Sequence, residues 1–145
     1  MVDIYVASKF ENKAAVRAAQ TEVRKRGWGI SFDWTGEAVD VSGSKVIDWN
    51  TPYQTADEAH LRESAYNDYC GVTGSSAVLI LNHAHGCGMW TEMGIAIAHG
   101  IPVYVVGPEI RRNIFFYLPE SFKLQTFSTL EEALARMESD FKNKW

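Results

Sequence analysis

The chain has 145 residues, of which 46% are hydrophobic and 22% are charged, and its formal net charge at pH 7 is −4. This length and composition predict one soluble globular domain, residues 1–145. The negative charge argues against a nucleic-acid-binding protein, because contacts with phosphates need clustered lysines and arginines. No stretch approaches the roughly 18 apolar residues of a membrane span, and the N-terminus reads as a strand rather than a signal peptide. With only two cysteines, these features predict a cytoplasmic protein without a membrane partner.

The first third of the chain predicts a strand, a helix and a second strand. Residues 3–7 form an apolar run of the right length for a buried strand. A helix is expected over 12–26, because apolar side chains recur there at helical spacing and Gly27 follows. Apolar residues alternate over 28–34, which predicts another strand, and the pattern is lost over 35–55. A loop of that length inside a domain is often functional, as a lid or a substrate loop.

A helix that carries an unusual carboxylate is predicted over 55–72. Thr55 and Glu58 have the spacing of a capping box, which opens a helix. Asp68 lies on the more apolar face of this helix. Residues at helical spacing on the same face are Leu61 and Ala65. We therefore expect Asp68 to be a polar residue on a buried stripe.

Residues 76–107 predict a strand, a loop, a helix and a further strand. The strands are expected over 77–81 and 103–106, where the residues are almost all Val, Ile, Leu or Ala. Between them lie a loop over 82–89 and a helix over 90–99, which Gly and Pro then end. Such a unit implies parallel strands and a right-handed crossover. In these sheets, ligands bind beyond the carboxyl ends of the strands.

The C-terminal part predicts a fifth strand and a last helix. A short strand is expected over 122–127, and a capping box of Ser128 and Glu131 predicts a helix that runs to about residue 144. About five strands then alternate with four helices along the chain. This order predicts a three-layer α/β sandwich around a central parallel sheet.

Three polar side chains are candidates for chemistry. Glu92 is expected in the first turn of its helix, where backbone N–H groups and the helix dipole favour an ionised carboxylate, as an anionic nucleophile requires. Acidic residues are also common in first turns without any function, and Asp68 could equally be a hydrogen-bonded structural residue. Two carboxylates near the same strand ends suit glycosidic-bond chemistry. Tyr5 could direct its hydroxyl toward this edge, or be a core tyrosine.

The sequence does not favour a metal or a cofactor. His83, His85 and Cys87 form an H-x-H-x-C string, but no second ligand pair stands at a recognised zinc spacing, so histidines that touch a base or the solvent are the better interpretation. Neither a dinucleotide-binding nor a P-loop glycine motif occurs. Trp34 flanks the long loop and could cover a planar base, although such residues more often belong to the core.

Three segments of the chain resemble the nucleoside 2-deoxyribosyltransferase-like superfamily, which includes the nucleoside deoxyribosyltransferases and the 2′-deoxynucleoside 5′-monophosphate N-glycosidases. They are IYVASKF, DYCGVTGSSAVLIL and GCGMWTEMGIAIAHGIPVYVVG. The most specific piece is E-x-G-x-A-x-A-x-G-x-P, formed by Glu92, Gly94, Ala96, Ala98, Gly100 and Pro102. The resemblance implies a flavodoxin-like, Rossmann-like α/β sandwich. It also implies a homodimer or a higher homo-oligomer in which a neighbouring subunit completes each site, and the aromatic segment 115–117 is our expected contact.

The resemblance assigns roles to the three candidate residues. Glu92 matches the nucleophile that attacks C1′ of the sugar, and Asp68 matches the carboxylate that orients the sugar and protonates the departing base. Tyr5 matches a tyrosine that holds the nucleophile. The chain departs from the pattern at Gly86, where the transferases carry Asp and the nucleotide hydrolases carry Ser. His85 could serve there instead, or loop N–H groups could hold a phosphate.

These assignments lead to a predicted activity on a small-molecule nucleoside or nucleotide. We expect cleavage of the N-glycosidic bond of 2′-deoxyribonucleosides through a deoxyribosyl-Glu92 intermediate, with transfer of the sugar to another base. Transfer is favoured over hydrolysis of the monophosphate because a phosphate-binding Ser is missing. A nucleotide-binding or sensing module without turnover is the non-enzymatic alternative. The expected substrate contacts are Ser8, Phe10, Trp34, His85, Gly86, Gly88 and Met89.

Overall fold

The computed structural model describes residues 1–35, 58–83, 88–107 and 113–144. The long loop predicted over 35–55 and the helix cap at Thr55 therefore lie outside the described residues, apart from Thr35. Within the described part, five parallel strands form one sheet in the order β2-β1-β3-β4-β5. The strands are β1 (Asp3–Ser8), β2 (Gly29–Ile30), β3 (Ala77–Leu81), β4 (Val103–Val106) and β5 (Leu124–Phe127).

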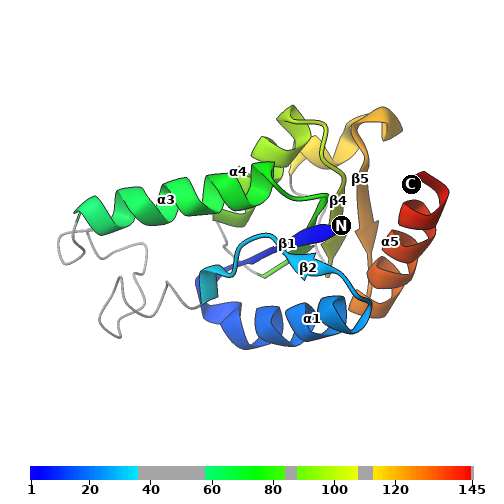
Figure 1. The fold of residues 1–145 in the computed structure, drawn as a ribbon. Coiled ribbons are helices and arrows are strands. Elements are labelled where there is room, and N and C mark those ends of the chain that lie inside the picture. Colours follow the sequence, from blue (N-terminus) through cyan, green and yellow to red (C-terminus); the bar gives the residue numbers. More distant parts are fainter. Residues whose placement is uncertain (36–57, 84–87, 108–112, 145) are drawn as a thin grey trace.

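Helices cover both faces of the sheet, as Figure 1 shows. The helices α1 (Lys13–Lys25) and α5 (Leu130–Lys144) lie on one face, and α3 (Glu58–Thr73) and α4 (Gly88–Ala98) lie on the other. Short 3₁₀ helices span Phe10–Asn12, Ile114–Tyr117 and Glu120–Phe122. This arrangement confirms the predicted three-layer α/β sandwich. The strand β2 follows β1 in sequence and lies on one side of the β1–β3 pair, whereas β4 follows β3 and lies on the other side. The strand order therefore reverses between β1 and β3, and ligands bind at such a switch point in parallel sheets.

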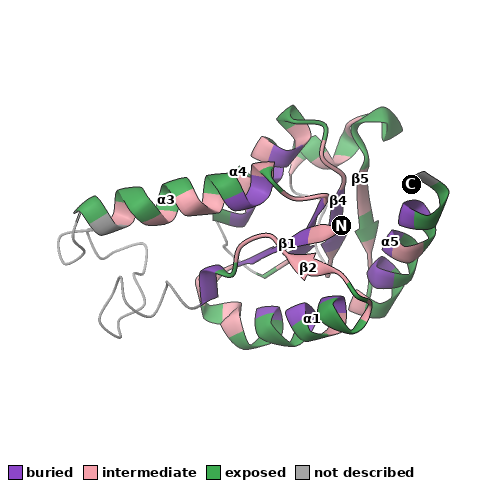
Figure 2. Cartoon of the chain, in the orientation of Figure 1, coloured by how far each residue is buried: buried purple, intermediate pink, exposed green. Residues whose placement is uncertain are grey.

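The central strands are buried because their sequences are almost entirely apolar. All five residues of β3 are buried, as are residues 4–8 of β1 and 103–105 of β4. Figure 2 shows this buried layer between helices whose outer faces are exposed. Strands covered on both faces need apolar residues at every position rather than alternation, which is why the sequence located β3 and β4 correctly.

The second strand is shorter than we predicted. Alternation over 28–34 indicated one strand, but β2 comprises only Gly29–Ile30. Beyond it, the indole N–H of Trp34 takes the place of a strand and donates to the carbonyl oxygen of Val6 at 2.7 Å. Asp33 accepts a hydrogen bond from the backbone N–H two residues later at 3.0 Å, which starts a helical turn. The edge of β1 is thus closed by a side chain.

The cap of the last helix also differs from the prediction. Helix α5 begins at Leu130, and Thr129 rather than Ser128 supplies the capping oxygen. The Thr129 Oγ1 atom accepts a hydrogen bond from the backbone N–H of Glu132 at 3.2 Å. Two neighbouring hydroxyl residues precede the helix, and spacing alone selected the wrong one.

A buried carboxylate joins α5 to the sheet. Asp140 accepts hydrogen bonds from the hydroxyl of Tyr104 at 2.7 Å and from the amide of Gln125 at 3.1 Å, and Arg136 donates to its other oxygen at 3.0 Å. Burial alone would raise the pKa of Asp140, but these hydrogen bonds and the charge of Arg136 lower it below its ordinary value. The carboxylate is therefore ionised and satisfied at neutral pH.

We expect Asp140→Ala to lower the free energy of unfolding by about 2–4 kcal/mol, because it leaves the buried hydroxyl of Tyr104 without its acceptor. Urea denaturation followed by circular dichroism measures this. Arg136→Ala is the control, and it should cost less than about 1 kcal/mol because the Arg136 side chain is 55% exposed. Equal losses in the two variants would contradict a stabilising role for the buried hydrogen bonds.

Candidate active site

Three separate elements bring Tyr5, Asp68 and Glu92 together on the α3–α4 side of the switch point. Tyr5 belongs to β1 and is 1% exposed, and its hydroxyl donates a hydrogen bond to Oε2 of Glu92 on α4. Asp68 on α3 is close enough for its charge to raise the pKa of both other groups. The sequence separations of these residues are large, and only the crossover connections between β1, α3 and α4 bring them into contact. The structure therefore unites the three predicted catalytic residues.

Glu92 does not occupy the helix position that we expected. Helix α4 begins at Gly88, so Glu92 is the fifth helical residue, and no acidic residue lies in the first turn within Gly88–Ala98. Burial raises the pKa of Glu92 to about 8; the Tyr5 hydrogen bond opposes this rise, and the charge of Asp68 adds to it. The expectation that the helix dipole keeps Glu92 ionised is thus wrong. Burial therefore favours the protonated form of this carboxyl group at neutral pH.

Asp68 lies where α3 reaches the rest of the domain. The first half of α3 extends beyond the sheet with mostly exposed side chains (Figures 1 and 2). Of the predicted buried stripe, Leu61 and Asp68 are partly buried, whereas Ala65 is exposed. The Oδ1 atom of Asp68 is shielded from solvent. The carboxyl group therefore belongs to the interior, although most of its helix does not.

Tyr5 remains a neutral hydrogen-bond donor. Burial raises the pKa of its hydroxyl far above the ordinary value, and the charges of Glu92 and Asp68 and hydrogen bonding to both carboxyl groups raise it further. A phenol in this state does not ionise at any physiological pH. It can stabilise a neighbouring carboxylate without losing its own proton.

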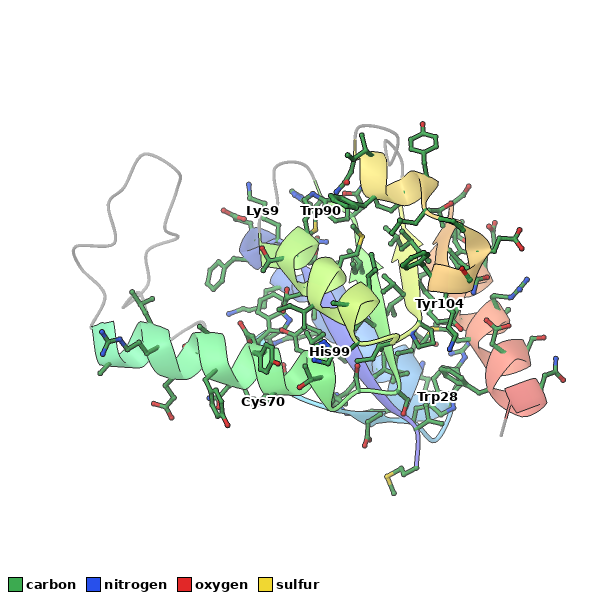
Figure 3. The ribbon with its side chains drawn as sticks, turned by 90° about the horizontal axis from the view of Figure 1, so that it is seen from above. Lys9, Trp28, Cys70, Trp90, His99 and Tyr104 are labelled. Atoms are coloured by element: carbon green, nitrogen blue, oxygen red, sulfur yellow. The ribbon has the colours of Figure 1, made fainter. Side chains whose placement is uncertain are left out.

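The two predicted contacts in the first loop lie at the carboxyl end of β1. The hydroxyl of Ser8 donates to the carbonyl oxygen of Leu81 at 2.6 Å and accepts from the Asn12 amide at 3.0 Å, so it ties β1 to β3 and to the following turn. Phe10 is partly buried against the core. Figure 3 shows Lys9, in the same loop, at the same end of the sheet as Trp90 near the start of α4. Contact of Ser8 or Phe10 with a substrate stays a prediction.

The remaining predicted contacts divide into three groups. Trp34 and Met89 belong to the hydrophobic core, with exposed fractions of 9% and 1%. Gly88 is the exposed first residue of α4. His85 and Gly86 lie outside the described residues. Their contacts with a substrate stay predictions as well.

One residue that sequence reasoning missed lies directly against Tyr5. Gly71 is in the interior of α3, one turn after Asp68, and a Cβ atom at this position would lie 2.9 Å from two ring carbons of Tyr5. The available signal was a glycine inside a helical pattern, which usually has a packing or functional reason.

Neither metal binding nor a membrane segment is found in the part of the chain that the structure describes. There, no three His, Cys, Asp or Glu side chains gather as ligands for a metal ion. His85 and Cys87 of the H-x-H-x-C string lie outside that part. Among the same described residues, none of the helices combines the length and apolar character that crossing a bilayer requires.

The predicted oligomer contact forms part of the 3₁₀ helix Ile114–Tyr117. Phe115 and Tyr117 are 54% and 71% exposed, whereas the ring of Phe116 packs edge-to-face on Trp90 at 5.5 Å. This contact anchors the segment to α4 and leaves its other aromatic side chains on the surface. A homo-oligomer that uses them stays a prediction.

Comparison with known proteins finds similarity in structure but not in sequence. No protein-family model matches the chain, and no curated protein matches it in sequence. The structure of the Clostridium botulinum CMP N-glycosidase BcmB superposes with a TM-score of 0.59 over 94% of this chain and 98% of that chain, at 12% identity. This chain has the same fold as that N-glycosidase. The solution structure of BlsM also has a TM-score of 0.59, over 90% of this chain and 83% of that chain, at 13% identity. At these identities, the similarity shows that the three chains share a fold, in agreement with the predicted flavodoxin-like α/β sandwich.

Proposed function

We propose that this protein is an N-glycosidase that breaks the bond between the base and the sugar of a nucleoside or nucleotide. The observation that carries the proposal is the cluster of Tyr5, Asp68 and Glu92, because two carboxyl groups and one fixed donor meet beside the switch point of the sheet. The fold shared with a protein named as a CMP N-glycosidase supports the choice of bond. Glycosidic cleavage needs one carboxylate and one carboxylic acid, and this cluster supplies both.

The first step forms a glycosyl-enzyme. An ionised oxygen of Glu92 bonds to C1′ while the bond between C1′ and the base nitrogen breaks, and the base nitrogen keeps the electron pair. Asp68 gives its proton to the departing base and becomes a carboxylate. In the second step, water attacks C1′ and the bond to Glu92 breaks. The proton of that water returns to Asp68, which restores the starting enzyme.

The proton balance of the carboxyl pair suits this reaction. Because Glu92 has a pKa of about 8, its protonated form is favoured at neutral pH, and this proton must pass to Asp68 before Glu92 attacks. The hydrogen bond from Tyr5 lowers the pKa of Glu92 and so reduces the free-energy cost of ionising this carboxyl group before the attack. Tyr5 thereby prepares the nucleophile.

Transfer to a second base is the other candidate outcome. It shares the first step with hydrolysis, and a free base replaces water as the acceptor of the sugar. The resemblance favours transfer, because Gly86 stands where the nucleotide hydrolases carry Ser. The name of the fold neighbour BcmB favours cleavage of a monophosphate.

The experiment separates these outcomes with one set of substrates. The protein is incubated with ribo- and deoxyribonucleosides and their 5′-monophosphates, CMP and dCMP included, with and without a free base, and the bases are separated by chromatography. Base release in water alone identifies a hydrolase, and base exchange only with an acceptor identifies a transferase. Thermal stabilisation by a ligand without any product would overturn the enzymatic proposal in favour of a binding module. If no product forms and no ligand stabilises the protein, both the enzymatic proposal and the binding-module alternative would be overturned.

A further inference from the structure

We propose that Gly71 is a positioning residue. Because it has no side chain, the ring of Tyr5 can pack directly against α3, in the position from which its hydroxyl reaches Glu92. This inference rests on the proposed N-glycosidase function. A Cβ atom on Gly71 would lie 2.9 Å from Cδ2 and Cε2 of Tyr5 and 2.7 Å from Cβ of Phe32. Real Cβ atoms essentially never approach other heavy atoms this closely, so any larger residue must displace the ring or move α3.

The backbone at Gly71 is fixed as well. The hydroxyl of Ser31 donates to the carbonyl oxygen of Gly71 at 2.8 Å, and the backbone N–H of Ser31 donates to the carbonyl oxygen of Ile4 at 3.1 Å. Carbonyl groups in the last turn of a helix lack a partner within the helix, and Ser31 fills this one from the sheet side. Ser31 thus connects the β1 residue next to Tyr5 with the α3 residue against its ring.

The close contact at Gly71 also affects the position of Asp68 on α3. Asp68 is three residues before Gly71, and residues at this spacing lie on the same side of a helix. The close approach at Gly71 therefore brings Asp68 to the ring and hydroxyl that face Glu92. A small shift of α3 would therefore change the relative positions of Tyr5, Asp68 and Glu92. A misplacement of catalytic groups by about 1 Å can lower the rate about a hundredfold.

The first test compares two glycine-to-alanine substitutions. We expect Gly71→Ala to lower kcat by about 10- to 100-fold and to change KM by less than about threefold, because it misplaces reacting groups rather than binding groups. Gly94→Ala is the matched control on α4, where an added Cβ meets nothing within 4 Å, and it should leave kcat unchanged. A loss of activity in Gly71→Ala that matches the fraction of unfolded protein would overturn the proposal.

The second test measures the titration of Glu92 without substrate, by NMR of protein labelled at the glutamate carboxyl carbons. Tyr5→Phe removes a hydrogen bond that lowers the pKa of Glu92, so this pKa should rise. Gly71→Ala should raise it in the same way, and the double variant should show no further rise. An unchanged pKa in Gly71→Ala, or a fully additive double variant, would overturn the proposal.

The titration does not depend on turnover, so it separates this inference from the proposed function. The protein could lack glycosidase activity while Gly71→Ala still changes the pKa of Glu92. That result would support the positioning role of Gly71 and overturn the proposed reaction. If Gly71→Ala does not fold, the same titration is measured in Ser31→Ala. This variant removes the hydrogen bond to the Gly71 carbonyl oxygen without adding an atom. It should raise the pKa of Glu92 by a smaller amount, and no change would overturn the proposal.

Discussion

Glu92→Gln should abolish base release, with kcat lowered by at least about a thousandfold. The amide has nearly the same size as the carboxyl group and still offers an oxygen to the Tyr5 hydroxyl, so the fold and the substrate site stay intact. It has no anionic oxygen that could bond to C1′, which removes the first step of the reaction. Chromatographic measurement of free base over long incubation times, together with the melting temperature of the variant, gives both quantities.

Glu132→Gln is the matched control for this prediction. Glu132 is exposed in the first turn of α5, and the same change there should leave base release at the wild-type rate. A 2′-fluoro substrate should slow the second step, because fluorine destabilises positive charge on the sugar. The intact mass should then reveal a sugar attached to wild-type protein but not to Glu92→Gln. Release of base by Glu92→Gln at the wild-type rate would remove Glu92 from the role of nucleophile.

The sequence predicted the central strands more accurately than the edge strand. Residues 77–81 and 103–106 are strands with the predicted bounds, because a strand covered on both faces needs an uninterrupted apolar run. Among the residues that the structure describes, the edge strand β2 pairs only with β1. There, Trp34 supplies through its indole N–H the hydrogen bond that a longer strand would give. Alternation of apolar residues does not distinguish these two cases.

The identity of the candidate catalytic residues was also accessible from the sequence, but their electrostatics were not. Glu92, Asp68 and Tyr5 stand out one by one, and the structure shows that they meet. Placing the start of α4 two residues too late put Glu92 in the first turn, and the burial that raises its pKa depends on contacts that the sequence does not show. The role of Gly71 depends on which ring lies against it, and that contact exists only after the crossovers have formed.

The pH dependence of stability should reveal the proton on Glu92. The pKa of Glu92 in the folded protein is about 8, above the ordinary value of 4.5. The folded state therefore binds this proton more tightly than the unfolded chain does. The resulting stability is complete below pH 4.5 and is lost as the pH rises through 8. We expect the free energy of unfolding of the wild type to fall over this window by about 2–4 kcal/mol relative to Glu92→Gln. Urea denaturation at a series of pH values measures the difference.

Base release should decline in the same alkaline range. Above pH 8 Glu92 has lost the proton that must pass to Asp68 before the base departs, so the rate should fall about tenfold per pH unit. Asp68→Asn removes a charge that raises the pKa of Glu92, so the loss of stability should be complete at a lower pH in that variant. Identical stability profiles for wild type and Glu92→Gln would show that Glu92 is already ionised at neutral pH. That result would contradict the proposed transfer of a proton from Glu92 to Asp68 before the attack.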